Sequence, residues 1–104
     1  MQLLRQRFPR FALAWLLIGV QISGCAGAPV QEMSNARQAV RAAQRAGADQ
    51  YAPQILFEAE RLLDQASGNL SRGEYRAARD QAEQARAKAL EARRLAEEAT
   101  RTKP

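Results

Sequence analysis

The sequence predicts an all-α protein: a three-helix antiparallel bundle, or a helical hairpin, whose last helix is long, alanine-rich and coiled-coil-like. From residue 25 onward, Ala, Glu, Lys, Leu and Arg make up 47 of the 80 residues, a composition typical of coiled coils and long helices. In the same region apolar residues recur at intervals of three and four, which is the spacing of one face of an α-helix.

The first 24 residues differ from the rest and follow the order of a secretory signal peptide. Arg5, Arg7 and Arg10 precede the run FALAWLLIGVQI, and small residues follow that run. A basic region, an apolar region and a small-residue cleavage zone in this order are typical of such signals. The run is shorter than the ~20 apolar residues that a membrane-spanning helix needs. We therefore expect a cleaved leader over residues 1–24; an uncleaved membrane helix, or a signal cut at another bond, is the alternative.

The segment Ile22-Ser23-Gly24-Cys25 resembles the lipobox of bacterial lipoproteins. The resemblance implies a diacylglycerol thioether on Cys25, signal-peptidase cleavage between Gly24 and Cys25, and acylation of the new amino terminus with a fatty acid such as palmitate. Two or three acyl chains attach a protein stably, at ~0.8 kcal/mol per buried CH₂. Because Ala26 stands where an Asp resembles the enterobacterial inner-membrane retention mark, the outer membrane is expected rather than the inner, with the body in the periplasm.

The residues that carry most enzyme chemistry are scarce. The chain contains one cysteine and no histidine, which excludes an internal disulfide, a histidine general base and any His or multi-Cys metal site. We expect no catalytic residues, no metal and no cofactor. After Cys25 the 13 basic and 11 acidic residues are interleaved, so no single-signed stripe is available for nucleic acid. The pairs Glu58/Glu60 and Glu97/Glu98 are interpreted as solvated charges.

Glycine and proline divide the remainder into a tether and a helical domain. Residues 25–30 are expected to form the tether, and residues 31–104 the domain. The first helix is predicted over about residues 31–47, because Gly47 stands where helices often end. A break over residues 49–53 follows it.

Two longer helices complete the predicted domain. The second is expected over about residues 52–70, since Pro53 suits the first turn of a helix. The third is expected over about residues 74–101, because this stretch contains neither Gly nor Pro.

The third helix carries a regular small-residue stripe that we call the alanine seam. Its members recur at alternating intervals of three and four over four heptads, which is a coiled-coil period. Alanine at these positions lets helix axes approach closely, so the seam is predicted to pack against other helices. Tyr75 stands beside a turn, where a tyrosine usually packs its ring, so we interpret it as a packing residue rather than as a contact for a partner. The seam consists of Tyr75, Ala78, Ala82, Ala85, Ala89, Ala92, Ala96 and Ala99.

Only 13 residues after Cys25 are large and apolar. Even if each were fully buried, at ~1.5–3 kcal/mol per side chain, they would stabilise an 80-residue domain only marginally. We therefore expect the helices to associate with a second copy or with an envelope protein.

The stretch from Ala36 to Ala99 is similar to the family called domain of unknown function 4398. That resemblance implies a small helical module of the kind found in Gram-negative lipoproteins and beside OmpA-like domains, and it implies no activity. The residues that carry it are Ala36-Arg37-Gln38-Ala39, Gly47-Ala48, Tyr51-Ala52-Pro53, Leu56, Ala59, Leu62, Ala66, Gly73-Glu74-Tyr75, Ala78, Ala82 and Ala85.

Two functions remain open at this point. The first is a non-enzymatic structural or protein-interaction lipoprotein of the cell envelope, attached to the membrane through Cys25, whose alanine seam docks on a partner or a second copy. The second is a small-ligand or stress-related binding module of the periplasm, with the ligand between the second and third helices. The second function needs a cavity that an alanine seam tends to close.

Overall fold

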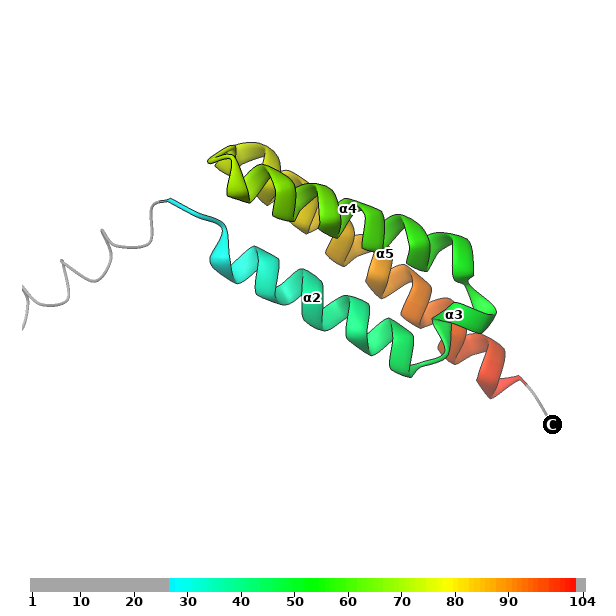
Figure 1. Ribbon diagram of the computed structural model, residues 1–104. Helices are drawn as coiled ribbons and strands as arrows, with labels where there is room; N and C mark the ends of the chain where they lie inside the picture. The colour runs from blue at the N-terminus through cyan, green and yellow to red at the C-terminus, as the bar shows by residue number, and fades with distance from the viewer. Residues whose placement is uncertain (1–26, 103–104) are drawn as a thin grey trace, which may run out of the picture.

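The protein is seen in a computed structural model that describes residues 27–102, and within this range every regular element is a helix (Figure 1). The helices are α2 (Val30–Arg45), α3 (Ala48–Tyr51), α4 (Pro53–Ser71) and α5 (Tyr75–Arg101). The predicted all-α fold with a long last helix is thus confirmed. The predicted leader, Gly24 and Cys25 lie outside the described residues.

The three long helices lie side by side, and α5 packs against both others (Figure 1). Helix α4 runs antiparallel to α2 and α5, which share one direction. As a result the α4–α5 turn and the start of α2 lie at the same end. We call this the turn end (residues 27–30 and 71–76), and the opposite end, formed by α3, the start of α4 and the last turns of α5, the corner end.

The passage from α2 to α4 contains a helical turn that the prediction lacks. Helix α2 ends at Arg45, two residues before Gly47, and Gly47 takes a left-handed backbone with φ +91°. The carbonyl of Gly47 then accepts hydrogen bonds from the amides of Gln50 and Tyr51 at 3.0 Å, so part of the expected break is the single helical turn α3. Burial explains the difference, because Ala48 is fully buried against α5.

The α4–α5 turn is closed by backbone hydrogen bonds. The amide of Glu74 donates to the carbonyl of Asn69 at 2.8 Å and the amide of Gly73 donates to that of Leu70 at 3.1 Å, while Gly73 has φ +77°. This geometry ends a helix at a left-handed glycine. The Asn69 side chain also donates to Gln81 at 2.6 Å, which fixes the two helices across the turn.

The interior consists mainly of alanine. Among the described residues, 13 of the 17 buried hydrophobic side chains are alanine, so mostly methyl groups separate the helices and the axes lie close. The larger contributions come from Met33, Val40, Leu56 and Leu62. No charged or polar side chain is buried within residues 27–102, which leaves the interior purely apolar.

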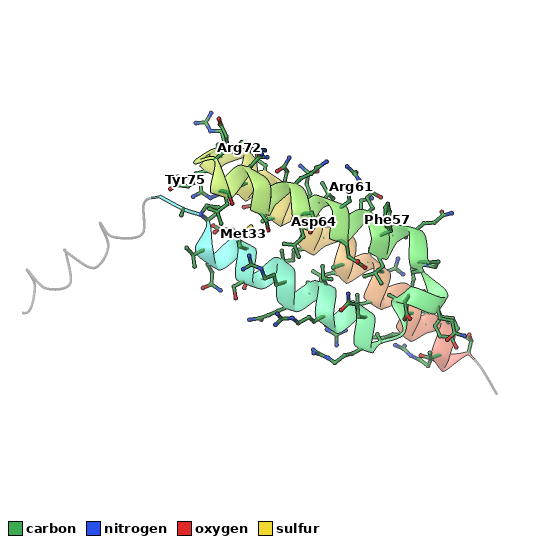
Figure 2. The ribbon with its side chains drawn as sticks, in the orientation of Figure 1. Met33, Phe57, Arg61, Asp64, Arg72 and Tyr75 are labelled. Carbon is green, nitrogen blue, oxygen red and sulfur yellow. The ribbon has the colours of Figure 1, made fainter. Side chains whose placement is uncertain are left out.

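Four of the large apolar residues counted toward the core lie on the surface instead. Val30 is 70% exposed, Phe57 69%, Tyr75 43% and Leu90 41%. Phe57 follows the buried Leu56 and therefore points about 100° away from it around α4. Figure 2 shows Phe57 on the outer side of α4, together with Arg61 and Asp64.

Replacing Ala89 by leucine tests the close packing. Ala89 is fully buried in α5 between its neighbours, so the added carbons must push helices apart. We expect a loss of about 1–3 kcal/mol in the free energy of unfolding, measured by urea denaturation followed by circular dichroism. Ala87→Leu, on the exposed face of the same helix, is the control and should change stability by less than about 0.5 kcal/mol. Equal effects of the two changes would contradict close packing at Ala89.

Candidate functional site

Arg79 fastens the beginning of the described chain to α5. Its Nη2 donates to the carbonyl of Gly27 at 3.1 Å, and its Nε lies 3.5 Å from a carboxylate oxygen of Glu32. Pro29 is fully buried, and the amide of Met33 donates to the carbonyl of Pro29 at 3.0 Å. The start of α2 is therefore held on the second turn of α5.

This attachment shortens the predicted tether. Helix α2 begins at Val30, and Pro29 and Gly27 already contact the domain, so residues 25–30 do not act as a free linker throughout. Only Ala26 separates Cys25 from the held Gly27. Since a chain extends at most ~3.6 Å per residue, the Cα atoms of Cys25 and Gly27 lie within about 7 Å of each other.

The alanine seam lies mostly in the interior. Tyr75 is 43% exposed and Ala99 is partly exposed, because they stand at the two ends of α5. The six seam residues between them are buried against the chain's own α2 and α4, so a partner has no access to them in this fold. These six are Ala78, Ala82, Ala85, Ala89, Ala92 and Ala96.

An open groove runs between α2 and α5. Its volume is about 310 Å³. Its apolar part includes the exposed Leu90, and three arginines lie around it, so the groove combines hydrocarbon with positive charge. The lining residues of this α2/α5 groove are Asn35, Gln38, Ala39, Ala42, Arg45, Arg86, Leu90 and Arg93.

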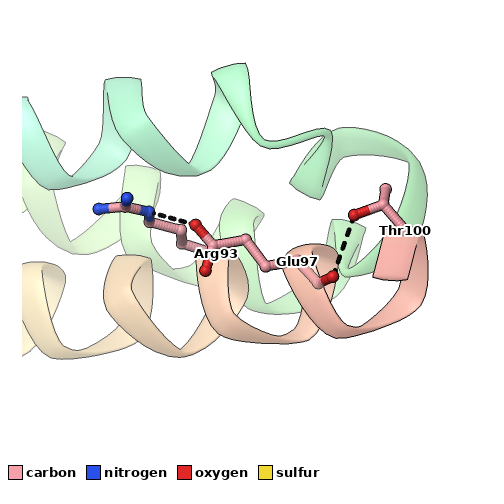
Figure 3. Close-up of polar contacts among 3 residues, drawn as sticks. All are labelled: Arg93, Glu97 and Thr100. Carbon is pink, nitrogen blue, oxygen red and sulfur yellow. Dashed lines mark hydrogen bonds and ion pairs between the residues drawn. The ribbon is translucent and has the colours of Figure 1, made fainter. Parts of the chain in front are cut away.

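Arg93 is held at the groove by its own helix. Its Nε donates to a carboxylate oxygen of Glu97 at 2.8 Å, one turn later (Figure 3). The hydroxyl of Thr100 donates to the backbone carbonyl of Glu97 at 3.0 Å. Arg45 and Arg86 add two exposed guanidinium groups, so the groove keeps a positive balance after the pairing with Glu97.

A second open hollow lies at the corner end, with a volume of about 350 Å³. It is formed where α3 meets α4 and is more hydrophobic, with Ile55 and Leu95 among its walls. Tyr51 contributes its ring to the same hollow. Because Ile55 belongs to α4 and Leu95 to α5, this hollow joins the two helices between which the alternative ligand site was expected.

Three of the four carboxylates considered in the sequence, Glu58, Glu97 and Glu98, take part in exposed ion pairs. Glu58 lies 3.7 Å from Lys88 of α5, and Glu98 lies 2.9 Å from Arg94. Within residues 27–102 no three His, Cys, Asp or Glu side chains gather as metal ligands would. In the same range, no helix combines the length and hydrophobicity that crossing a membrane requires.

Sequence reasoning missed Arg79 and Glu32. Forty-seven positions separate them, and a lone arginine and a lone glutamate at that distance form no motif. Nothing in the local pattern distinguishes Arg79 from the other arginines of α5. Only the parallel packing of α2 on α5 brings the two together.

Comparison with known proteins places these features in a family. Residues 31–103 match the family model described as Domain of unknown function (DUF4398), which covers nearly all of the described helices. The resemblance noted in the sequence is thereby confirmed. No curated protein and no solved structure matches the chain.

Replacing Arg79 by alanine tests the attachment at the turn end. The pair is partly exposed, so we expect a cost of up to about 1 kcal/mol, concentrated in the first turn of α2. Hydrogen exchange of the amides from Val30 to Met33 should accelerate up to about fivefold. Arg76→Ala, one turn earlier on an exposed position of α5, should leave these amides unchanged. Unchanged exchange in Arg79→Ala would show that Pro29 alone holds the segment.

Proposed function

The chain belongs to the DUF4398 family, and on that premise we propose that it is a non-enzymatic lipoprotein of a Gram-negative envelope that binds a partner helix. In this proposal lipid on Cys25 attaches the chain to the membrane, the outer membrane in preference to the inner, and the helical domain stands in the periplasm. The family description names no activity, so the function rests on the residues themselves.

The observation that carries the proposal is the α2/α5 groove. The interior is filled by the domain's own methyl groups, so binding takes place at the surface. There Leu90, Ala39 and Ala42 offer a narrow apolar floor, and Arg45 and Arg86 flank it. Small residues in the floor let another helix approach closely, and the arginines favour acidic residues beside its apolar stripe.

A second copy is one candidate for that partner helix. The outer side of α4 carries the exposed Phe57 with Glu60 and Asp64 nearby in sequence, which are the apolar and acidic features that the groove favours. An envelope protein with an acidic amphipathic helix is the other candidate. Both belong to the same class of function, a structural or interaction module.

The alternative function is a small-ligand module. The observation in its favour is again the groove, because three guanidinium groups around about 310 Å³ suit an anionic ligand. The α2/α5 groove is open to solvent, whereas ligand sites generally enclose most of the ligand surface. The partner helix therefore remains the proposal, and the experiments below separate the two.

The lipid anchor is tested by replacing Cys25 with serine. We expect the wild-type chain to begin at residue 25 and to carry the mass of a diacylglyceryl group and an N-acyl chain, and to fractionate with membranes. Cys25→Ser lacks the only thiol of the chain and should be neither lipidated nor cut at that bond. A wild-type chain that is unmodified, or cut elsewhere, would refute the lipoprotein part of the proposal.

The groove is tested by site-specific photo-crosslinking in cells that express the full chain. A photoreactive amino acid at Gln38, which lines the groove, should give one defined protein adduct. The same probe at the exposed Gln84 of α5, which does not line the groove, should give none. Leu90→Glu should abolish the adduct by placing a charge on the apolar floor, while circular dichroism remains unchanged.

Phe57→Glu distinguishes the candidate partners. If the adduct is a dimer of the chain, Phe57→Glu should weaken it; if the adduct contains another envelope protein, Phe57→Glu should leave it intact. Absence of any protein adduct from Gln38, together with anion-dependent protection of Arg86 from chemical modification, would favour the small-ligand function instead.

A further inference from the structure

We propose that the turn end of the bundle rests on the phospholipid surface, with Tyr75 and Val30 at headgroup depth and Arg72 and Arg76 facing lipid phosphates. The rest of the bundle then points away from the membrane. This inference rests on the proposed lipidation of Cys25 and adds the orientation and the contact surface.

The first step is distance. The Cα of Cys25, the residue that carries the proposed lipid, lies within about 7 Å of the Cα of Gly27 even along a fully extended chain. Gly27 in turn accepts a hydrogen bond from Arg79 at 3.1 Å, and Arg79 stands one turn from the start of α5. The turn end is thus too close to the anchor to stand clear of the headgroups.

The second step is the chemistry of the turn end. Two of the four exposed large apolar residues in the described chain, Val30 and Tyr75, belong to it. Figure 2 shows Tyr75 and Arg72 at the end where the described chain begins. Tyrosine is enriched at membrane interfaces, where its ring meets hydrocarbon and its hydroxyl meets water. The exposed position of Tyr75 at the start of α5 suits this environment.

The third step is charge. Arg72 and Arg76 are both exposed at this end. One Nη of Arg72 donates to the Asn69 side chain at 2.6 Å, and a guanidinium has five N–H groups, so further donors remain for a phosphate. Glu74 is the acidic residue of the turn, and Arg79 is balanced by Glu32. The turn end is therefore net positive, which favours anionic headgroups.

Two of the long faces are less suited to the membrane, because the outer side of α4 exposes Asp64 and α5 exposes Glu83 and Glu91, which anionic headgroups repel. The side of α2 is basic, with Arg37, Arg41 and Arg45 exposed, so a bundle lying on α2 is the competing orientation that the experiment below separates. Helix α5 has 27 residues and spans ~40 Å at 1.5 Å per residue. An upright bundle places the corner end at that distance from the turn end, and leaves the α2/α5 groove accessible from the periplasm.

Single tryptophans measure this orientation. Trp15 is the only tryptophan of the chain and precedes Cys25, so the mature forms of Tyr75→Trp and Gln54→Trp each contain one indole. Gln54 is exposed at the corner end and is the matched control. Each full chain is expressed, matured, purified from membranes and reconstituted in phosphatidylcholine–phosphatidylglycerol vesicles with brominated acyl chains. Circular dichroism verifies the fold.

We expect a roughly twofold or larger loss of emission for Tyr75→Trp, because an interfacial indole approaches the bromine atoms, and no loss for Gln54→Trp. Equal quenching of both variants would show a bundle lying flat, and quenching of neither would show a bundle held off the surface. Either result overturns the proposal. Replacing Arg72 and Arg76 together by glutamine should reduce the quenching of Tyr75→Trp in the anionic vesicles.

The mass of each sample separates this inference from the proposed function. A chain without lipid on Cys25 contradicts the proposed function, and the free thiol of that chain, the only one present, is then coupled to a maleimide phospholipid in the same vesicles. The quenching pattern of the coupled variants decides the orientation by the same criteria.

Discussion

The close approach of three helices across alanine is the interaction on which the rest of this structure depends. Six alanines of α5 are fully buried, and α2 and α4, which pack against α5, also contribute buried alanines. Each buried CH₂ contributes only ~0.8 kcal/mol, so no single side chain dominates the stability. The contribution is spread along the whole length of α5, and it requires the axes to stay close at every turn.

An interior made of methyl groups determines what remains at the surface. The interior has little room for large side chains, and Phe57 and Leu90 lie on the surface. The α2/α5 groove, with its three arginines, is open to solvent. The charged side chains likewise lie on the surface, in exposed ion pairs such as Lys88 with Glu58 and Arg93 with Glu97. A fold of this kind is suited to surface recognition, and the proposed interaction function follows from that division.

The turn end connects the fold to the membrane in the proposed function. Packing of α2 parallel to α5 brings Arg79 onto Gly27 and Glu32, so the first described residues belong to the domain. A lipid attached two residues earlier would transmit its position to the bundle through a very short segment. The hydrogen bond from Arg79 to Gly27 would thereby restrict how the domain sits on a bilayer in the proposed arrangement.

The sequence by itself determined the class of the fold and the helical content, because glycine, proline and a three-four period act locally. It also determined which residues of α5 are small enough for an interior, and the family to which the chain belongs. Tertiary structure alone decided the turn α3, where burial of Ala48 outweighed the local break, and the exposure of Tyr75, which depends on where α5 begins relative to its neighbours. It alone decided the contact of Arg79 with Glu32 and the groove beside Leu90. These features join positions on different helices, and a period within one helix holds no information about the direction and offset at which another helix packs against it.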